Sequence, residues 1–342
     1  QAIKNQEKIC IFADYDVDGA TSAALLKNVF RELGVEVEIY VPDRIEEGYG
    51  PTLSAMQKLK DKGNKVLITV DCGSVAFEAL LYAADIGLDV IVIDHHISLD
   101  KLPKAVAVIN PNRIDEGSNY KNLAAVGVSF LFAVAFCSRL RQEGFFEDTS
   151  IKHPDLIKQL DVVALGTVCD VMTLTGLNRA FVKQGLKIAR SRANIGYAAL
   201  CDAAELDEAI NCYHLGFILG PRINSGGRVG TSSLGAALLS TNNSQKAKEI
   251  SEELTIHNNN RKIIELTILE EAHKLAKLQA NNAVIFVSGN GWHPGVIGIV
   301  AGRLKETYNR PVAVVAVNES IGKASCRSVR GCDFGSALME AK

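Results

Sequence analysis

Short runs of almost continuously apolar residues recur in the first third of the chain, and amphipathic segments separate them. The runs at 66–70 and 90–93 contain no charged residue. Apolarity on both sides of a strand is typical of strands covered on both faces, so this pattern predicts a doubly wound α/β fold with a parallel sheet. The predicted strands are Ile9–Asp14, Val35–Val41, Lys65–Asp71, Val90–Asp94 and Ala105–Ile109, and the predicted helices between them are Ala20–Leu33, Thr52–Asp61 and Val75–Ile86.

The rest of the chain indicates a second, smaller α/β domain. A length of 342 residues suggests about two domains. The pattern from 123 to about 239 is mostly helical, and the polar, periodic segment from 244 to 280 has neither Pro nor Gly, which predicts a connecting helix. Strand and helix patterns then resume at 283–287, 295–308 and 311–317. We therefore predict a parallel-sheet domain over 1–240, a connecting helix over 241–281 and a smaller domain over 282–342.

Composition narrows the function classes. The 37 basic and 39 acidic residues give a net charge of −2, which argues against a uniformly basic nucleic-acid coat but leaves a local basic groove open. The longest apolar run, 124–137, is shorter than the roughly 20 residues that span a bilayer, so we predict a buried helix and no membrane association. Eight scattered cysteines without a CxxC pair argue against structural zinc and favour a reducing, cytoplasmic compartment. A first residue that is Gln and a helix-like end predict a fragment, with the smaller domain truncated.

Acidic residues and histidines follow several of the predicted strands. The carboxyl ends of parallel strands share one edge of a sheet, so these side chains are expected to lie close together. Clustered carboxylates repel one another and are costly to bury unpaired, and divalent Mn²⁺ or Mg²⁺ suits a set of carboxylates with an imidazole. Two ions sharing a carboxylate would suit cleavage of phosphate esters. The residues concerned are Asp14, Asp16, Asp18, Asp71, Asp94, His95, His96 and Asp170.

These residues also have simpler interpretations. Asp-x-Asp-x-Asp-Gly begins an EF-hand loop as well, but the twelfth position counted from Asp14 is Leu25 where that loop needs Glu, and a strand precedes the motif. A single Asp at a strand end is commonly a helix or turn cap, and a His pair alone is more often a surface pair. The joint placement at successive strand ends favours the metal site.

The order of these motifs resembles the DHH phosphoesterases. The matching segments are Asp14–Gly19, Val70–Gly73, Asp94–His96 and Gly166–Asp170. Three further segments, Gly220–Gly230, Gly291–Arg303 and Gly322–Ser328, resemble the RecJ family, which are single-strand-specific exonucleases. The resemblance runs from about Ile9 to the end of the chain.

This resemblance implies roles for the strand-end residues. Asp16 would bind one metal ion, and Asp18, His95 and Asp170 would bind the other. Asp71 would bridge both ions. His96 would face the scissile phosphate as an electrostatic stabiliser or acid, and Asp14 and Asp94 would orient the ligands. Some relatives have a His ligand four residues before the second Asp of the first motif, where this chain has Phe12, so the first ion would be completed by water or bound more weakly.

Basic residues in Gly- and Ser-rich segments, which we expect to be loops, predict a phosphate-binding surface. Each Arg alone is more often simply solvated, but several flanked by small residues favour phosphate cradling. The resemblance implies that these loops face the metal site across a groove for one strand. His293 is a substrate contact or a structural residue beside the only Trp. Aromatic residues make up 6% of the chain, so extensive base stacking is not expected, and Tyr15 and Tyr49 are weak candidates. The substrate-binding candidates are Arg222, Asn224, Arg228, His293, Ser325, Arg327 and Ser328.

The resemblance implies a metal-dependent 5′-to-3′ exonuclease that cleaves single-stranded DNA to mononucleotides in DNA repair and recombination. Its expected partners are single-stranded DNA, a single-strand-binding protein and a helicase. One alternative is a small-substrate DHH phosphoesterase, such as an oligoribonuclease or a cyclic-dinucleotide phosphodiesterase, which the connecting helix and the 220–224 segment disfavour. The other is a catalytically inactive binding relative, which the complete acidic set disfavours. No Walker-type loop is present in the sequence, so ATP use is not expected.

Overall fold

The computed structural model describes residues 1–44, 46–149 and 151–341, and the chain divides into two compact units. The first unit covers residues 1–255 and holds a five-stranded sheet with most of the helices. The second unit covers residues 256–342 and holds a three-stranded sheet. The boundary between the units falls inside the long helix α11 (Ser244–Lys277).

The sheet of the first unit is parallel throughout and has the order β2-β1-β3-β4-β5, which confirms the predicted α/β fold class. Every predicted strand is present, although the second and fifth are shorter than expected. Ala13 pairs with Val70, and Val70 pairs with Ile93, so three strands end side by side. The strands are β1 (Ile9–Ala13), β2 (Glu38–Tyr40), β3 (Val66–Val70), β4 (Asp89–Ile93) and β5 (Ala107–Ile109).

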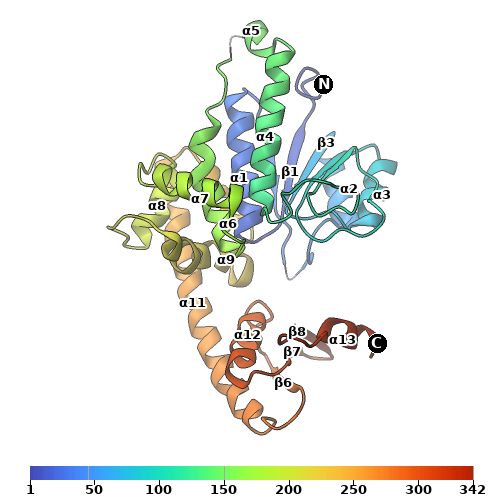
Figure 1. Ribbon diagram of the computed structural model, residues 1–342, viewed down its shortest axis with the longest axis vertical. Helices are drawn as coiled ribbons and strands as arrows, with labels where there is room; N and C mark the ends of the chain where they lie inside the picture. Colours follow the sequence, from blue (N-terminus) through green and yellow to red (C-terminus); the bar gives the residue numbers. More distant parts are fainter. Residues whose placement is uncertain (45, 150, 342) are drawn as a thin grey trace. The chain divides into compact units, whose positions relative to one another are not determined.

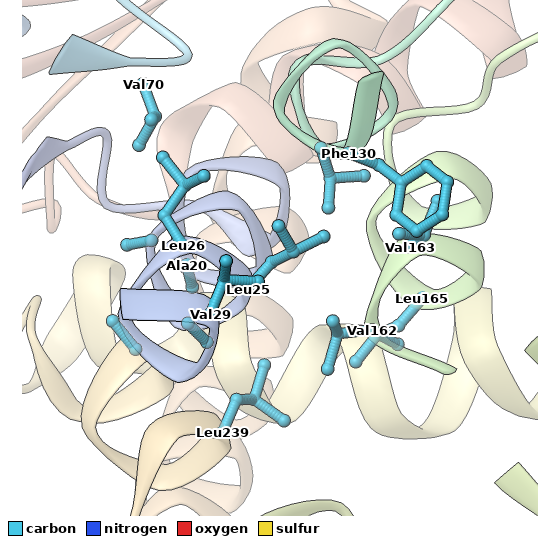
Figure 2. Close-up of a cluster of buried hydrophobic side chains, with 14 of the residues drawn as sticks. Ala20, Leu25, Leu26, Val29, Val70, Phe130, Val162, Val163, Leu165 and Leu239 are labelled. Atoms are coloured by element: carbon cyan, nitrogen blue, oxygen red, sulfur yellow. The ribbon is translucent and has the colours of Figure 1, made fainter. Parts of the chain in front are cut away.

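Helix α1 (Val17–Glu32) lies at the centre of the main hydrophobic core. It packs against α4, α6 and α10, and Figure 2 shows Leu25, Leu26 and Val29 of α1 surrounded by side chains from these helices and by Val70 of β3. A separate apolar cluster covers the other face of the sheet and includes Met56 of α2. The helices named here are α2 (Leu53–Asp61), α4 (Ala125–Gln142), α6 (Leu160–Cys169) and α10 (Leu234–Ser240).

The remaining helices of the first unit follow the mostly helical pattern predicted after residue 123 (Figure 1). In the described part of the chain, α4 is the one helix whose length and apolar composition would allow a membrane span, and half of it is buried in the core. The other elements are α3 (Phe77–Asp85), α5 (Phe145–Thr149), the 3₁₀ helix η1 (Leu156–Gln159), α7 (Gly176–Ala189), α8 (Ile195–Ala203), the π-helix η2 (His214–Leu219) and α9 (Gly220–Val229).

Helix α9 corrects one prediction, because the Gly-rich segment that carries Arg222 and Arg228 was expected to be a loop. Pro221 stands in its first turn, where a missing N–H costs no helical hydrogen bond. Ile223 is buried in the main core and fixes the inner face of the helix. Glycines that looked like loop residues instead allow this helix to pack closely against its neighbours.

The second unit is built around the C-terminal part of α11, shown in orange in Figure 1. In its sheet, β6 pairs with β7 in parallel and β7 pairs with β8 antiparallel. Strand β8 corrects a second prediction, because residues 322–328 were expected to be a loop; their backbone pairs with the apolar strand β7 from Val312 to Asn318. The elements are β6 (Ile285–Asn290), α12 (Ile297–Tyr308), β7 (Val312–Asn318), β8 (Ile321–Arg327) and α13 (Phe334–Glu340).

Candidate metal centre

Acidic and imidazole groups meet at the edge where β1, β3 and β4 end. Within each of three groups of side chains, one ligand atom per residue lies within 4.8 Å of the others. Asp71 belongs to two of these groups and His95 belongs to two, so the groups form one continuous cluster. The groups are Asp14, Asp16 and Asp71; Asp71, His95 and His96; and Asp18, His95 and Asp170.

Asp71 occupies the middle of this cluster and has a strained backbone. Its φ is +61°, a left-handed conformation that non-glycine residues rarely adopt and that concentrates at functional sites. The backbone is held by the bond from its N–H to Ile93 O (3.0 Å) and by Tyr49, whose hydroxyl donates to Asp71 O (3.2 Å). The residue is 2% exposed, and its Oδ1 lies 3.3 Å from His95 Nε2. The surrounding structure therefore fixes where this carboxylate points.

Asp18 is held by the N-terminus of helix α4. The N–H groups of Ala125 and Val126 donate to its two carboxylate oxygens at 2.6 and 2.9 Å. Helix N-termini favour negative charge, so α4 stabilises the buried carboxylate. The contact joins segments more than a hundred residues apart, and no local sequence signal announces it. Sequence reasoning found Asp18 but missed the helix that positions it.

Asp94 orients the two histidines that follow it. Its Oδ1 accepts from His95 N (2.7 Å) and lies 2.8 Å from His96 Nδ1, and its Oδ2 accepts from Ser74 N (3.0 Å). Two asparagines after β5, which sequence reasoning missed, donate to the backbone here: Asn110 to His96 O at 2.8 Å and Asn112 to His95 O at 2.5 Å. The side chain of His96 is half-exposed, so its other ring nitrogen can reach a substrate.

Several oxygens of the cluster are buried without a hydrogen-bond partner in the described part of the chain, namely Asp14 Oδ1, Asp71 Oδ1 and Asp170 Oδ2. Unpaired buried carboxylate oxygens are costly, and a divalent cation is the partner that would satisfy them. The donor set of carboxylates with imidazole nitrogen suits Mn²⁺ or Mg²⁺. The residues present therefore fit divalent metal ions.

The pKa values of the carboxylates also indicate that the cluster needs a cation. Burial, reinforced by Asp16, raises the pKa of Asp14 to about 7, and burial with Asp16 raises the pKa of Asp170 to about 6. Burial also raises the pKa of Asp18 and of Asp71. Each shift reports a carboxylate that lacks a compensating positive charge.

The pKa values of the Asp94–His96 pair shift the other way. Burial acts to raise the pKa of Asp94, but the hydrogen bond and charge of His96 outweigh it and the pKa falls. The same hydrogen bond raises the pKa of His96, whereas burial lowers the pKa of His95. Asp94 is therefore already satisfied by the protein, which suits an orienting residue.

Phe12 lies in the apolar cluster on the far face of the sheet and packs against Tyr40, with ring centroids 5.5 Å apart. Its side chain offers no ligand atom in the place where some relatives have a His. Asp14, two residues later, instead places an oxygen in the group with Asp16 and Asp71. Asp14 is therefore a candidate metal ligand, whereas the sequence reasoning had assigned it an orienting role.

Helix α9 carries the predicted Arg222, Asn224 and Arg228, and it contacts the segment that follows β1 through Asn224 and Gly227. Asn224 Oδ1 accepts from Val17 N (3.2 Å) at the start of α1. A Cβ at Gly227 would lie 2.9 Å from Tyr15 O, so only glycine allows this approach. Arg222 is half-buried and donates to Ile218 O (2.7 Å), and burial lowers its pKa.

Two further groups stand near the cluster on the segment after β2. Arg44, which sequence reasoning missed, lies over the Tyr15 ring with its guanidinium carbon 5.0 Å from the centroid. Tyr49, a weak candidate from the sequence, meets His96 edge-on with ring centroids 6.1 Å apart. Both residues belong to the first unit, so their placement beside the cluster follows from that unit alone.

The other predicted substrate-binding residues belong to the second unit. Arg327 Nη1 lies 3.5 Å from Ser325 Oγ and donates to Cys326 O (2.9 Å), which places these two side chains together. Ser328 Oγ donates to Cys332 O (2.6 Å), and His293 Nδ1 accepts from Gly295 N (3.1 Å). That these residues face the metal cluster across a groove stays a prediction.

Comparison with known proteins identifies the class. The model of the DHH family, N-terminal domain, matches residues 8–167, and that of the DHHA1 domain matches residues 280–342. The single-stranded-DNA-specific exonuclease RecJ of Haemophilus influenzae is 38% identical over 350 residues, covering 99% of this chain and 60% of that protein. This chain thus spans about 60% of the length of that curated relative.

Solved structures agree with the sequence matches. A crystal structure of exonuclease RecJ bound to manganese is 30% identical with a TM-score of 0.84, and the match covers 98% of this chain and 81% of that one. RecJ from Thermus thermophilus in complex with Mg²⁺ is 28% identical with a TM-score of 0.75, covering 99% of this chain and 45% of that one. The chain belongs to the RecJ family of DHH proteins.

Proposed function

We propose that the chain is the catalytic part of a metal-dependent exonuclease that degrades single-stranded DNA from the 5′ end to mononucleotides. The observation that carries the proposal is the continuous cluster of ligand groups that share Asp71 and His95. Two cations that share a carboxylate can hold the attacking and leaving oxygens of a phosphodiester at once. The family membership supplies the substrate class, because the relatives are named single-stranded-DNA-specific exonucleases.

In this proposal the cluster holds two ions. Asp14, Asp16 and Asp71 would bind the first, and Asp18, His95 and Asp170 would bind the second, with Asp71 shared. Mn²⁺ or Mg²⁺, both found bound to relatives, would supply Lewis-acid charge and lower the pKa of a water molecule. The helix N-terminus at Asp18 and the left-handed backbone of Asp71 would keep the ligands in place before an ion binds.

The other residues would bind and orient the strand. Asp94 holds His96 Nδ1, so the remaining nitrogen of His96 would donate to a non-bridging oxygen or to the leaving oxygen of the scissile phosphate. Arg222 and Arg228 on α9 would contact phosphates beside the cluster. His293, Ser325, Arg327 and Ser328 would contact the strand from the second unit. Asn224 would chiefly fix α9 to the start of α1.

The 5′-to-3′ direction, the role in DNA repair and recombination, and the partners are the finer part of the proposal. The proposed place of work is the cytoplasm, with single-stranded DNA as substrate and a single-strand-binding protein and a helicase as partners. The support for these statements is the family membership and the substrate named for the relatives.

One assay tests the proposal. The purified chain is incubated with Mn²⁺ and single-stranded oligonucleotides labelled at the 5′ or the 3′ end. We expect labelled mononucleotide at once from the 5′ label and a ladder of shortening strands from the 3′ label. EDTA and Asp71→Ala should each abolish both. Rapid cleavage of a dinucleotide with no action on the long strand would instead identify a small-substrate phosphoesterase, and binding without cleavage would identify an inactive relative.

A further inference from the structure

Two aromatic rings of the first unit project into solvent although nothing in the metal chemistry requires them. Tyr213 is 61% exposed and Phe217 is 72% exposed, which makes them the two most exposed aromatic side chains among the described residues. Their rings are stacked, with centroids 5.2 Å apart and planes inclined by 26°. Such a pair exposes a flat apolar surface to water, so it calls for a ligand that covers it.

The backbone under the pair is irregular but firmly held. Phe217 lies in the π-helix η2, and Tyr213 directly precedes it. Single-turn π-helical segments often stand at functional sites. Asn211 Oδ1 accepts from Tyr213 N (2.9 Å) and from His214 N (3.2 Å), and Leu215 of the same segment is fully buried. The rings therefore sit on a rigid base, as a binding surface requires.

This base contacts Cys169, the residue directly before one member of the metal cluster. Cys169 Sγ donates to Leu215 O at 3.3 Å, and the next residue after Cys169 is the candidate ligand Asp170. A Cβ at Gly220 would lie 2.4 Å from Cys169 Sγ, so η2 and α9 meet directly against the end of α6. Arg222, the candidate phosphate contact, is bonded to Ile218 O, one residue after Phe217. The backbone that carries the rings thus contacts both Arg222 and the residue before the candidate ligand Asp170.

We propose that Tyr213 and Phe217 form a stacking platform for a nucleobase of the single strand whose backbone passes Arg222 to the cluster. The inference rests on the proposed function and adds to it a base-binding site beside the metal centre. Every base has a flat π-face, so stacking is tolerant of sequence and favours unpaired bases, because duplex bases are already stacked. The contact of Leu215 with Cys169, next to the candidate ligand Asp170, favours a nucleobase over a protein partner.

The test separates stacking from backbone contacts. Binding is measured in EDTA, where no cleavage occurs, to an oligothymidylate and to a strand of equal length with abasic sites. The wild type should bind the base-containing strand about tenfold more tightly. Tyr213→Ala/Phe217→Ala should bind both strands alike, with the affinity that the wild type shows for the abasic strand. Tyr213→Phe and Phe217→Tyr should keep the preference, and Phe286→Ala, which removes an exposed ring of the second unit, should change nothing.

Each contrary outcome has one meaning. A double variant that keeps the preference, with unchanged melting temperature and Mn²⁺ binding, overturns the platform and leaves the proposed function standing. Equal affinity of the wild type for both strands also overturns it. Failure of the wild type to bind either strand overturns the proposed function, and this inference with it.

Discussion

The two units bury acidic side chains in opposite ways. In the second unit, Glu265 of α11 is 1% exposed and is neutralised within the chain: Arg261 pairs with its Oε2 and Arg303 Nη2 lies 2.5 Å from its Oε1. In the first unit, the ion-pair partners of Asp71 and Asp170 within the described residues are imidazoles alone. Glu265 therefore has arginine partners within the chain, whereas Asp71 and Asp170 are paired, in the described part of it, with histidines alone.

This difference separates a structural ion pair from a site that awaits a ligand. A buried carboxylate held by two arginines can be explained by the folded chain alone. Several clustered, buried carboxylates whose pKa values are raised, with no arginine pair among the described residues such as the one that holds Glu265, cannot be explained in that way. The cost of holding them together is offset when divalent ions bind. The comparison therefore predicts that substituting an acid of the cluster changes metal binding and cleavage. Substituting Glu265 should instead change the stability of the protein.

Removal of the shared carboxylate should have the largest effect. Asp71→Ala should reduce the cleavage rate by more than about 100-fold, because both ions would lose a ligand oxygen. Residues that only hydrogen-bond to metal ligands typically cost roughly 10–100-fold when they are replaced. It should also weaken both bound Mn²⁺ ions, as measured by metal analysis and calorimetry on the purified variant. Two ions bound at full strength in Asp71→Ala would refute the bridging assignment.

The two adjacent histidines should behave differently. His96→Ala should slow turnover by about 100-fold or more, the size of a lost acid or electrostatic contact, and leave metal content nearly intact. His95→Ala is the matched comparison, since His95 belongs to the ligand group with Asp18 and Asp170, and it should lose metal. Single-turnover rates at saturating Mn²⁺ together with metal analysis distinguish the pair. Equal loss of metal in both variants would show that His96 is a ligand as well.

The structural ion pair should respond in stability and not in metal binding. Glu265→Gln should destabilise the protein by about 3 kcal/mol, because it leaves Arg261 buried without its partner. Denaturant unfolding measures this change, and Glu270→Gln on the exposed side of α11 is the control. Mn²⁺ affinity should be the same in all three proteins. A Glu265→Gln variant as stable as the wild type would remove one side of the comparison.

The smallest expected effects belong to the arginines of α9. Arg222→Ala or Arg228→Ala should weaken binding to all strand sequences alike and flatten the log–log salt dependence by up to about 0.7 per lost contact. Arg190→Ala, an exposed Arg at the end of α7, serves as control. Titrations at several salt concentrations give the slope. An altered sequence preference with an unchanged slope would mean that these side chains contact bases.

Some parts of the structure could be predicted from local sequence patterns, and other parts depend on contacts between distant segments. Apolar strands followed by Asp14, Asp71 and Asp94 predict a parallel sheet with acids at one edge. This prediction was possible because strand periodicity and strand ends are local features of the sequence. The bonds from α4 to Asp18 are not local, and neither is the role of Asn110 after β5. No sequence pattern reports which helix start meets which carboxylate.

Two errors have a related cause. The segments 220–230 and 322–328 are rich in Gly and Ser, which indicates loops when composition alone is considered. In the structure Ile223 buries one side of α9, and the apolar strand β7 pairs with β8. Tertiary packing therefore overrides weak local propensity at both places. The exposed pair at Tyr213 and Phe217 was missed because a low overall aromatic content says nothing of where two rings stand.

Thermal unfolding of metal-free and Mn²⁺-loaded protein tests most directly whether the strand-end acids are kept for external cations. The measurement compares wild type, Asp71→Asn and Glu265→Gln. We predict that Asp71→Asn raises the melting temperature of the metal-free protein, by about 2–4 °C for each kcal/mol gained in the free energy of unfolding. The same substitution should abolish the further rise in melting temperature on adding Mn²⁺. Glu265→Gln should lower it in both states and keep the Mn²⁺-dependent rise. A wild type that Mn²⁺ does not stabilise, or an Asp71→Asn that melts lower without metal, would contradict the account.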